Sequence, residues 1–314
     1  MSDKSLLCIG LTTLDIVAIP VTLDPFDGLR LVRSISIAPA GTAAGAALVA
    51  AKLGVPTRLC GVIGDDAVGR FVRSELEYEG VDTSLLKMAA GIGTAATLLP
   101  IDANGVRPVF HALGATHKLM ISDVVRKAAQ DVAALHYAGV GAPNLDGGPG
   151  RDLLATAKAA GVLTTCDLIG PGPNARAELQ ALLPYIDVFL PSSAEARVLT
   201  GETDLERAAA IFLSWGAGKC VIKNGADGVF VKTGGHAGWV LPAVPIATVV
   251  DTTSCGDSFC AGFIAATLRG KAWEEALAFA SATAALVAQG PATLGALQSF
   301  AQVEASMLPR QEAC

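Results

Sequence analysis

The alternation of short apolar runs with segments of helical length is the feature that most constrains this chain. Largely apolar runs, too short for helices, predict buried strands at 6–10, 58–63, 132–138, 162–167, 187–190 and 219–222. Helical patterns separate them at 42–53, 67–79, 151–160, 175–183 and 205–215. Apolar strands that alternate with helices are typical of a parallel sheet covered on both faces. We therefore expect a doubly wound α/β fold, with a mainly parallel sheet flanked by helices.

Strand-like runs at 15–20, 31–38, 94–101 and 106–111 break this rhythm, because little helix separates them. The Asn104-Gly105 step predicts a tight hairpin between the last two. These runs predict a small β-sheet lid lobe, formed by about 15–38 and 94–111, within a single domain spanning 1–314. A thin sheet cannot bury all of its apolar side chains alone, which predicts a homodimer through the lid. The side chains concerned are Val17, Ile19, Leu31, Ile35 and Ile37.

The last third of the chain has a different pattern. Runs at 229–232 and 237–241 predict a further hairpin, and 244–250 predicts a strand. A loop follows, and then two apolar helices at 256–268 and 273–288.

Composition excludes several classes of protein. Hydrophobic residues make up 52% and charged residues 17%, a balance that excludes intrinsic disorder. The net charge of −6, without blocks of like charge, argues against a nucleic-acid or membrane-surface partner. Asp15 interrupts the apolar start, which argues against export. The seven cysteines form no C-x-x-C pair and mostly lie in apolar runs, so we expect a reducing cytoplasm.

The most informative stretch runs Val249-Val250-Asp251-Thr252-Thr253-Ser254-Cys255-Gly256-Asp257. An apolar run leads into a loop of small residues, in which a helix begins. Unpaired N–H groups and the helix dipole there favour an anion, such as a transferring phosphoryl group. Asp257, in the first turn, could take a proton from an attacking hydroxyl. Helix capping alone would explain the same pattern, so both interpretations stay open at this point.

This stretch resembles the C-terminal signature, D-T-x-G-A-G-D, of the ribokinase-like (PfkB) family of small-molecule kinases. The family's N-terminal signature resembles segments 41–54, 61–69 and 79–82, in order and spacing. Shorter similarities are Gly10 to Asp15, Pro191 to Glu195 for the N-x-x-E element, and Gly225-Ala226-Asp227-Gly228. The resemblance covers nearly the whole chain and implies the family's fold with its lid.

The resemblance implies an ATP- and Mg²⁺-dependent kinase that phosphorylates a primary hydroxyl of a sugar or sugar derivative. It makes Asp257 the catalytic base, and makes the backbone N–H groups of Ser254, Cys255 and Gly256 an anion hole. Glu195 would order Mg²⁺ through water, and Asp251 with Thr253 would form part of a monovalent-cation (K⁺) site. The implied substrate residues are Thr13, Asp15, Gly41 and Gly45, and the implied nucleotide residues are Lys223, Gly225, Gly228 and Ser281.

The chain departs from the family pattern at several positions. Ala40 replaces the first glycine of a Gly-Gly pair, Ser192 replaces the asparagine of N-x-x-E, and Ser254 and Cys255 replace Gly and Ala. Serine suits position 254 only if the backbone there does not need a positive φ. Asp257 and Gly256 are retained, so we expect catalysis to be retained as well.

Gly45 stands where relatives have a sugar-binding asparagine. It marks either close helix packing or room for the substrate, and with Thr13 it argues against a strict ribokinase. A nucleoside kinase of the same family, whose substrate also presents a 5′-hydroxymethyl group, and a non-catalytic sugar-binding relative are the alternatives.

Overall fold

The computed structural model describes residues 4–22, 24, 28–145 and 148–307; Cys314 lies outside them. Its main sheet has the strand order β13-β12-β11-β10-β9-β8-β1-β4-β5. The parallel strands are β1 (Leu6–Gly10), β4 (Thr57–Gly64), β5 (Val81–Ala89), β8 (Ala134–Ala138), β9 (Leu163–Cys166), β10 (Val188–Phe189) and β11 (Lys219–Lys223). Two antiparallel strands extend one edge, β12 (Val229–Thr233) and β13 (Trp239–Leu241). The predicted fold class is confirmed.

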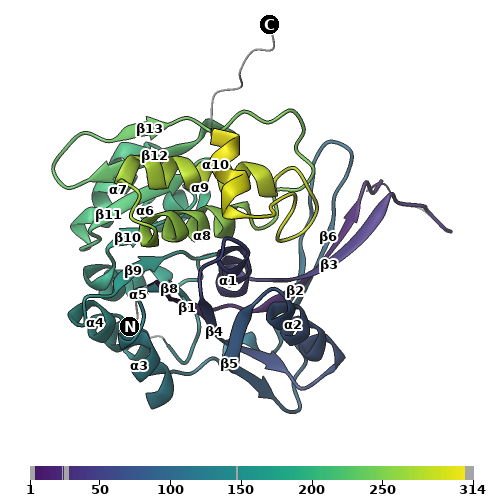
Figure 1. The fold of residues 1–314 in the computed structure, drawn as a ribbon, viewed down its shortest axis with the longest axis horizontal. Helices are drawn as coiled ribbons and strands as arrows, with labels where there is room; N and C mark the ends of the chain where they lie inside the picture. Colours follow the sequence, from purple (N-terminus) through teal and green to yellow (C-terminus); the bar gives the residue numbers. More distant parts are fainter. Residues whose placement is uncertain (1–3, 23, 25–27, 146–147, 308–314) are drawn as a thin grey trace, which may run out of the picture.

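Helices cover both faces of this sheet (Figure 1). One apolar cluster holds α1 (Thr42–Lys52), α2 (Ala67–Tyr78), α8 (Cys255–Leu268), α9 (Trp273–Val287) and α10 (Phe300–Met307). The other holds α3 (Asp123–Gln130), α4 (Pro149–Ala159), α5 (Ala175–Leu182), α6 (Ser193–Thr200) and α7 (Leu205–Ser214). Strand β1 supplies Leu6 and Cys8 to the first cluster and Leu7 and Ile9 to the second. Burial on both faces explains why such strands are apolar throughout.

The strand order reverses direction at β1. The chain builds β4 and β5 on one side of β1, and then continues from β8 on the other. Open α/β sheets bind ligands at such a point, beyond the carboxyl ends of the strands. Helix α1 begins there: the Thr42 hydroxyl donates to the Ala138 carbonyl at 3.1 Å, and the Leu11 carbonyl accepts from Ala43 and Ala44. The candidate site should therefore lie at the start of α1.

A second, four-stranded sheet has the order β3-β2-β6-β7 and is called the lid sheet below. Its strands are β2 (Thr13–Ile19), β3 (Ser34–Ala40), β6 (Ala96–Pro100) and β7 (Phe110–Ala112). In Figure 1, β2, β3 and β6 extend to the right of the main sheet. This is the predicted lid. Short 3₁₀ helices occur at η1 (Gly114–Lys118), η2 (Leu183–Tyr185) and η3 (Gly225–Asp227).

Several details of the prediction were wrong. Residues 106–109 are not a strand, and residues 101–109, called the lid loop below, form a longer connection than an Asn-Gly hairpin. Residues 244–250 form no strand either. Val17 and Ile19 are only 1% and 5% exposed, because they pack against Leu99, Ile101 and Ala292 instead of facing solvent.

Among the described residues, no helix is long and apolar enough to cross a bilayer.

Candidate active site

Asp257 lies in the first turn of α8 and is half-buried. Burial raises the pKa of its carboxyl to about 7, helped by the nearby charges of Asp167 and Asp15 and opposed by Lys223 and by a hydrogen bond with Ser254. A carboxylate with this pKa can accept a proton near neutral pH and hold it during a reaction. This pKa is compatible with the predicted role of Asp257 as a general base.

The predicted anion hole lies at the start of α8. Ser254 is the N-cap residue and has φ 57° and ψ 9°, in the left-handed region. Serine was expected to suit position 254 only if the backbone there does not need a positive φ, and that condition is not met. The left-handed conformation costs a serine about 1–2 kcal/mol. The Ser254 carbonyl accepts from the Ser258 hydroxyl at 2.7 Å. The Cys255 N–H, a predicted anion-hole donor, instead donates to the Thr252 carbonyl at 3.3 Å. The loop is thus held by local hydrogen bonds in a conformation that its sequence disfavours.

Gly45, in α1, lies directly against Asp257. A Cβ atom at position 45 would be 2.8 Å from Asp257 Oδ2 and 3.3 Å from its Cγ. Neither interpretation drawn from the sequence named this neighbour. The glycine makes room for the carboxylate itself, at the contact between α1 and α8.

Two charged side chains, Lys223 and Asp167, lie beside the start of α8. Lys223, at the end of β11, binds Asp167 Oδ2 through Nζ at 2.5 Å, and a Cβ atom on Gly256 would be 3.2 Å from that Nζ. Burial alone would lower the pKa of Lys223, but Asp167, Cys260 and Glu195 raise it. Lys223 therefore stays charged next to the predicted anion hole.

Glu195 begins α6 in a capping box with Ser192. Its Oε2 accepts from the Ser192 N–H at 2.7 Å, and the Ser192 hydroxyl accepts from the Glu195 N–H at 3.2 Å. Serine thus serves as N-cap where the family has asparagine. Burial and the charge of Asp167 raise the pKa of Glu195, while Lys223 lowers it. Glu195 therefore belongs to the same cluster of charged side chains as Asp167 and Lys223. Asp167 was not identified from the sequence, although an acid directly after an apolar parallel strand was the available signal.

One face of the lid sheet carries polar side chains toward the site. Asp15 on β2 pairs in register with Thr97 on β6, which pairs with His111 on β7. The Thr13 hydroxyl lies 3.3 Å from Asp15 Oδ1, and Thr97 Oγ1 lies 3.1 Å from His111 Nδ1. Burial raises the pKa of Asp15, whereas hydrogen bonds with Thr97 and Thr13 lower it. Thr97 and His111 could be linked to Asp15 only once the strand pairing was known.

The other predicted substrate and nucleotide residues have structural explanations. Gly41 has φ 94°, and a Cβ there would lie 2.7 Å from the Leu11 carbonyl. Gly225 and Gly228 have φ 57° and 88° in the turn before β12, where a Cβ on Gly228 would strike the Leu241 carbonyl at 2.0 Å. Ser281 is buried in α9. A nucleotide role for Gly225, Gly228 and Ser281 stays a prediction.

Asp251 and Thr253, which the resemblance assigns to a monovalent-cation site, directly precede Ser254. Asp251 Oδ1 accepts from the Thr253 N–H at 2.8 Å and from its hydroxyl at 2.5 Å, and Oδ2 accepts from the Ala292 N–H at 3.0 Å. Arg107 of the lid loop approaches the same group: its Nη1 lies 3.7 Å from Asp251 Oδ1 and donates to Thr253 Oγ1. Nothing in the sequence pattern had singled out Arg107.

The described geometry defines a class of enzyme. A carboxyl with a raised pKa, a helix N-terminus and a largely buried lysine lie together at the carboxyl end of a parallel sheet, below a lid that carries an acid. Such a site can bind an anion and take a proton beside it. The sequence profile of the pfkB family carbohydrate kinases matches residues 3–298. The chain belongs to this family and is a sugar kinase.

Individual relatives agree with this assignment. The chain is similar to a ribokinase from Haemophilus influenzae, at 29% identity over 296 residues that cover 90% of this chain and 92% of the relative. It is also 29% identical to a 2-dehydro-3-deoxygluconokinase from Bacillus subtilis, over 87% of each chain. Its fold matches that of an Arabidopsis thaliana ribokinase in complex with ribose and ATP, with a TM-score of 0.80, 23% identity and coverage of 97% and 98%.

Proposed function

We propose that this protein is an ATP-dependent kinase that phosphorylates a primary hydroxyl of a sugar or sugar derivative, and that the chain acts as one catalytic domain with a lid. The observation that carries the proposal is Asp257, a carboxyl with a pKa of about 7 at the N-terminus of α8. A carboxyl in that position can act as a base on a hydroxyl while the helix end holds the phosphoryl group.

The proposed reaction follows from this placement. Asp15, with Thr97 and His111 beside it, orients the substrate hydroxyls from the lid side. Asp257 takes the proton of the attacking hydroxyl as its oxygen bonds to the γ-phosphorus, and the bond from phosphorus to the β–γ bridging oxygen breaks, which releases ADP. The N–H groups at the start of α8 and the charge of Lys223 stabilise the equatorial phosphoryl oxygens.

The residues present also fit a magnesium ion carried with ATP. The described part of the chain holds no group of three His, Cys, Asp or Glu side chains placed to bind a metal. Mg²⁺ in phosphotransferases takes most of its ligands from phosphates and water and needs only one or two carboxylates. Glu195, with Asp167 next to it, would supply this contact, and the bound ion would neutralise phosphate charge. A nucleotide-dependent reaction also supports a cytoplasmic location.

Turnover with a panel of sugars, sugar acids and nucleosides, followed as ADP release, tests the proposal. We expect turnover with at least one sugar or sugar derivative. Preference for a nucleoside would move the protein to the nucleoside kinases of the family. Binding of a sugar without ADP release would contradict catalysis, provided that the protein is folded and ATP is saturating.

We further propose that two lids pack together in a homodimer. The lid face opposite Asp15 exposes Ile35 (66%), Ile37 (50%), Leu98 (45%) and Phe110 (61%). Exposed apolar patches of this kind mark protein–protein interaction sites. Sedimentation should give twice the mass of 31.8 kDa. Ile37→Asp should shift the protein to monomers, whereas Val240→Asp, at a 56% exposed position on β13, should not. A monomer for the unaltered chain at micromolar concentration would refute the proposal.

A further inference from the structure

Arg107 and the pair Asp251–Thr253 come from parts of the chain that are far apart in sequence. Arg107 is in the lid loop, and Asp251 and Thr253 directly precede the anion hole. The family resemblance makes these two residues part of a monovalent-cation site. The structure instead places a guanidinium there, 3.7 Å from Asp251 Oδ1 and hydrogen-bonded to Thr253 Oγ1. Figure 1 shows the lid loop rising between the lid sheet and the loops that follow β13 and α9.

The oxygen atoms around Asp251 already accept hydrogen bonds, so they do not leave a ligand set for a potassium ion. The side chain of Asp251 is fully buried, and both of its oxygens already accept hydrogen bonds, from Thr253 and from Ala292. The Ala288 carbonyl, on the neighbouring loop, accepts the N–H groups of Val250 and Asp251. A buried carboxylate needs a compensating positive charge. The nearby positive charge is that of Arg107, whose side chain is 29% exposed.

We infer that Arg107 is the built-in cation of this site: it replaces the monovalent ion that would otherwise hold the anion-hole loop in place. Asp251 and Thr253 are connected to Ser254 by the backbone, and Ser254 is held in a strained left-handed conformation. Removal of the charge that anchors Asp251 would let this strained turn relax. Arg107 is therefore a positioning residue that acts through Asp251 and Thr253 on the N–H groups of the hole.

This inference also couples the lid to the anion hole. Because Arg107 belongs to the lid loop, the hole is fixed in its working geometry only while Arg107 contacts Asp251 and Thr253. A cavity of about 190 Å³ separates these two segments next to the ion pair. Truncation of Arg107 would open its place toward this cavity, so that a small hydrated cation could enter.

The test uses Arg107→Ala in potassium chloride and in tetramethylammonium chloride at equal ionic strength. The wild-type protein should give the same melting temperature and the same turnover in both salts. The variant should lose turnover in tetramethylammonium by at least about tenfold, since a 1 Å misplacement of catalytic groups costs about 10²-fold. Potassium, or guanidinium ion at low concentration, should restore part of that turnover and should raise the melting temperature of the variant only. Arg107→Lys should retain more turnover than Arg107→Ala.

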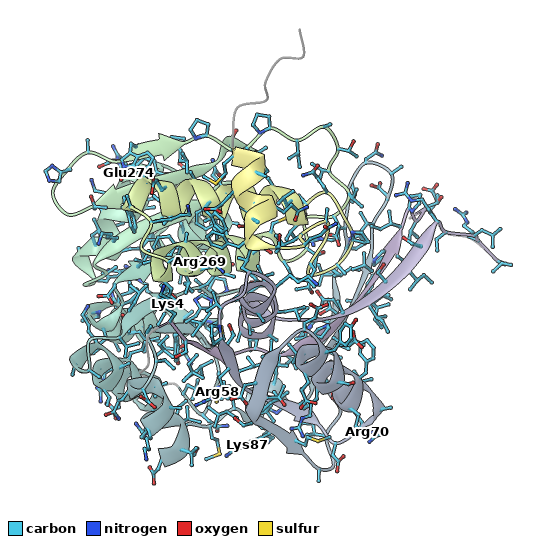
Figure 2. The ribbon with its side chains drawn as sticks, viewed as in Figure 1. Lys4, Arg58, Arg70, Lys87, Arg269 and Glu274 are labelled. Atoms are coloured by element: carbon cyan, nitrogen blue, oxygen red, sulfur yellow. The ribbon has the colours of Figure 1, made fainter. Side chains whose placement is uncertain are left out.

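Arg70→Ala is the matched control. Arg70 is on α2, 64% exposed and 3.9 Å from Asp65, and it lies on the molecule's periphery in Figure 2. This variant should behave like the wild type in both salts. Activation of the wild type by potassium would overturn the inference, as would a loss in Arg107→Ala that is confined to the KM for ATP and insensitive to potassium.

The inference rests on the proposed kinase reaction for its activity readout only. If the wild type turns over no compound of the panel, the proposed function fails, and the melting temperatures still decide the role of Arg107. A potassium-dependent melting temperature in Arg107→Ala, absent from the wild type and from Arg70→Ala, supports the inference. Equal melting temperatures of the Arg107→Ala variant in the two salts would overturn it.

Discussion

Gly45→Ala separates the catalytic role of the α1–α8 contact from its structural role. Gly45 lies inside α1 with ordinary helical geometry, so alanine suits its backbone and should favour the helix by about 1 kcal/mol. The three atoms nearest to the new methyl group all belong to the Asp257 side chain. It would sit 2.8 Å from Oδ2, where ordinary contact begins at 3.4 Å, so the carboxylate must move by more than half an ångström.

That displacement acts on the proposed base. General base catalysis contributes about 10²–10⁴-fold, and a 1 Å misplacement costs about 10²-fold. We therefore expect kcat to fall by about tenfold to 10²-fold, while the melting temperature stays equal or rises.

The assay is steady-state ADP release at saturating ATP, paired with thermal unfolding. Gly262→Ala is the control, because Gly262 is also a buried helical glycine but packs against α9: its Cβ would meet Thr283 Oγ1 at 2.7 Å and Ala280 Cα at 3.0 Å. That variant should lose about 1–3 kcal/mol of stability from overpacking and keep its kcat. Wild-type kcat in Gly45→Ala would refute the idea that position 45 fixes the place of Asp257.

Two more predictions concern the same loop. Ser254→Gly removes a left-handed serine that costs about 1–2 kcal/mol, so the melting temperature should not fall. The variant also loses the hydrogen bond of Ser254 that lowers the pKa of Asp257, so the acid limb of the pH–rate profile should move above its wild-type position near pH 7. A shift to lower pH would show that this bond does not act on the base. The pKa of the Asp257 carboxyl is raised from 3.8 to about 7, so the folded state holds this proton more tightly than the unfolded state does. The wild type should therefore lose stability relative to Asp257→Asn as pH rises from about 4 to 7, by at most about 4 kcal/mol. A melting-temperature difference that is constant with pH would contradict the raised pKa.

The parts of the fold that the sequence predicted are those with a strong local signal. Apolar runs such as 6–10 and 58–63 became central strands because burial on both faces requires apolar side chains at every position. The edge strand β5 was missed, since its buried and exposed residues alternate and Asp82 and Lys87 interrupt the run. The run 244–250 is apolar enough for a strand, but no neighbouring strand pairs with it in the sheet order.

The candidate site shows the same division. Asp257 and the small residues before it are contiguous in sequence, so the helix N-terminus could be recognised from one stretch. Thr97 and Arg107 became linked to Asp15 and Asp251 only through strand register and through a loop contact between distant segments. The backbone conformation of Ser254 was likewise unpredictable, because serine in that position does not reveal a positive φ.

Turnover of Asp257→Asn tests the central claim most directly. The asparagine preserves the size of the side chain but cannot accept the proton of the substrate hydroxyl. We expect kcat to fall by at least about 10²-fold, while the sugar and ATP still raise the melting temperature of the variant as they do that of the wild type. A variant that binds both ligands and turns over at a rate close to that of the wild type would contradict the assignment of Asp257 as the base.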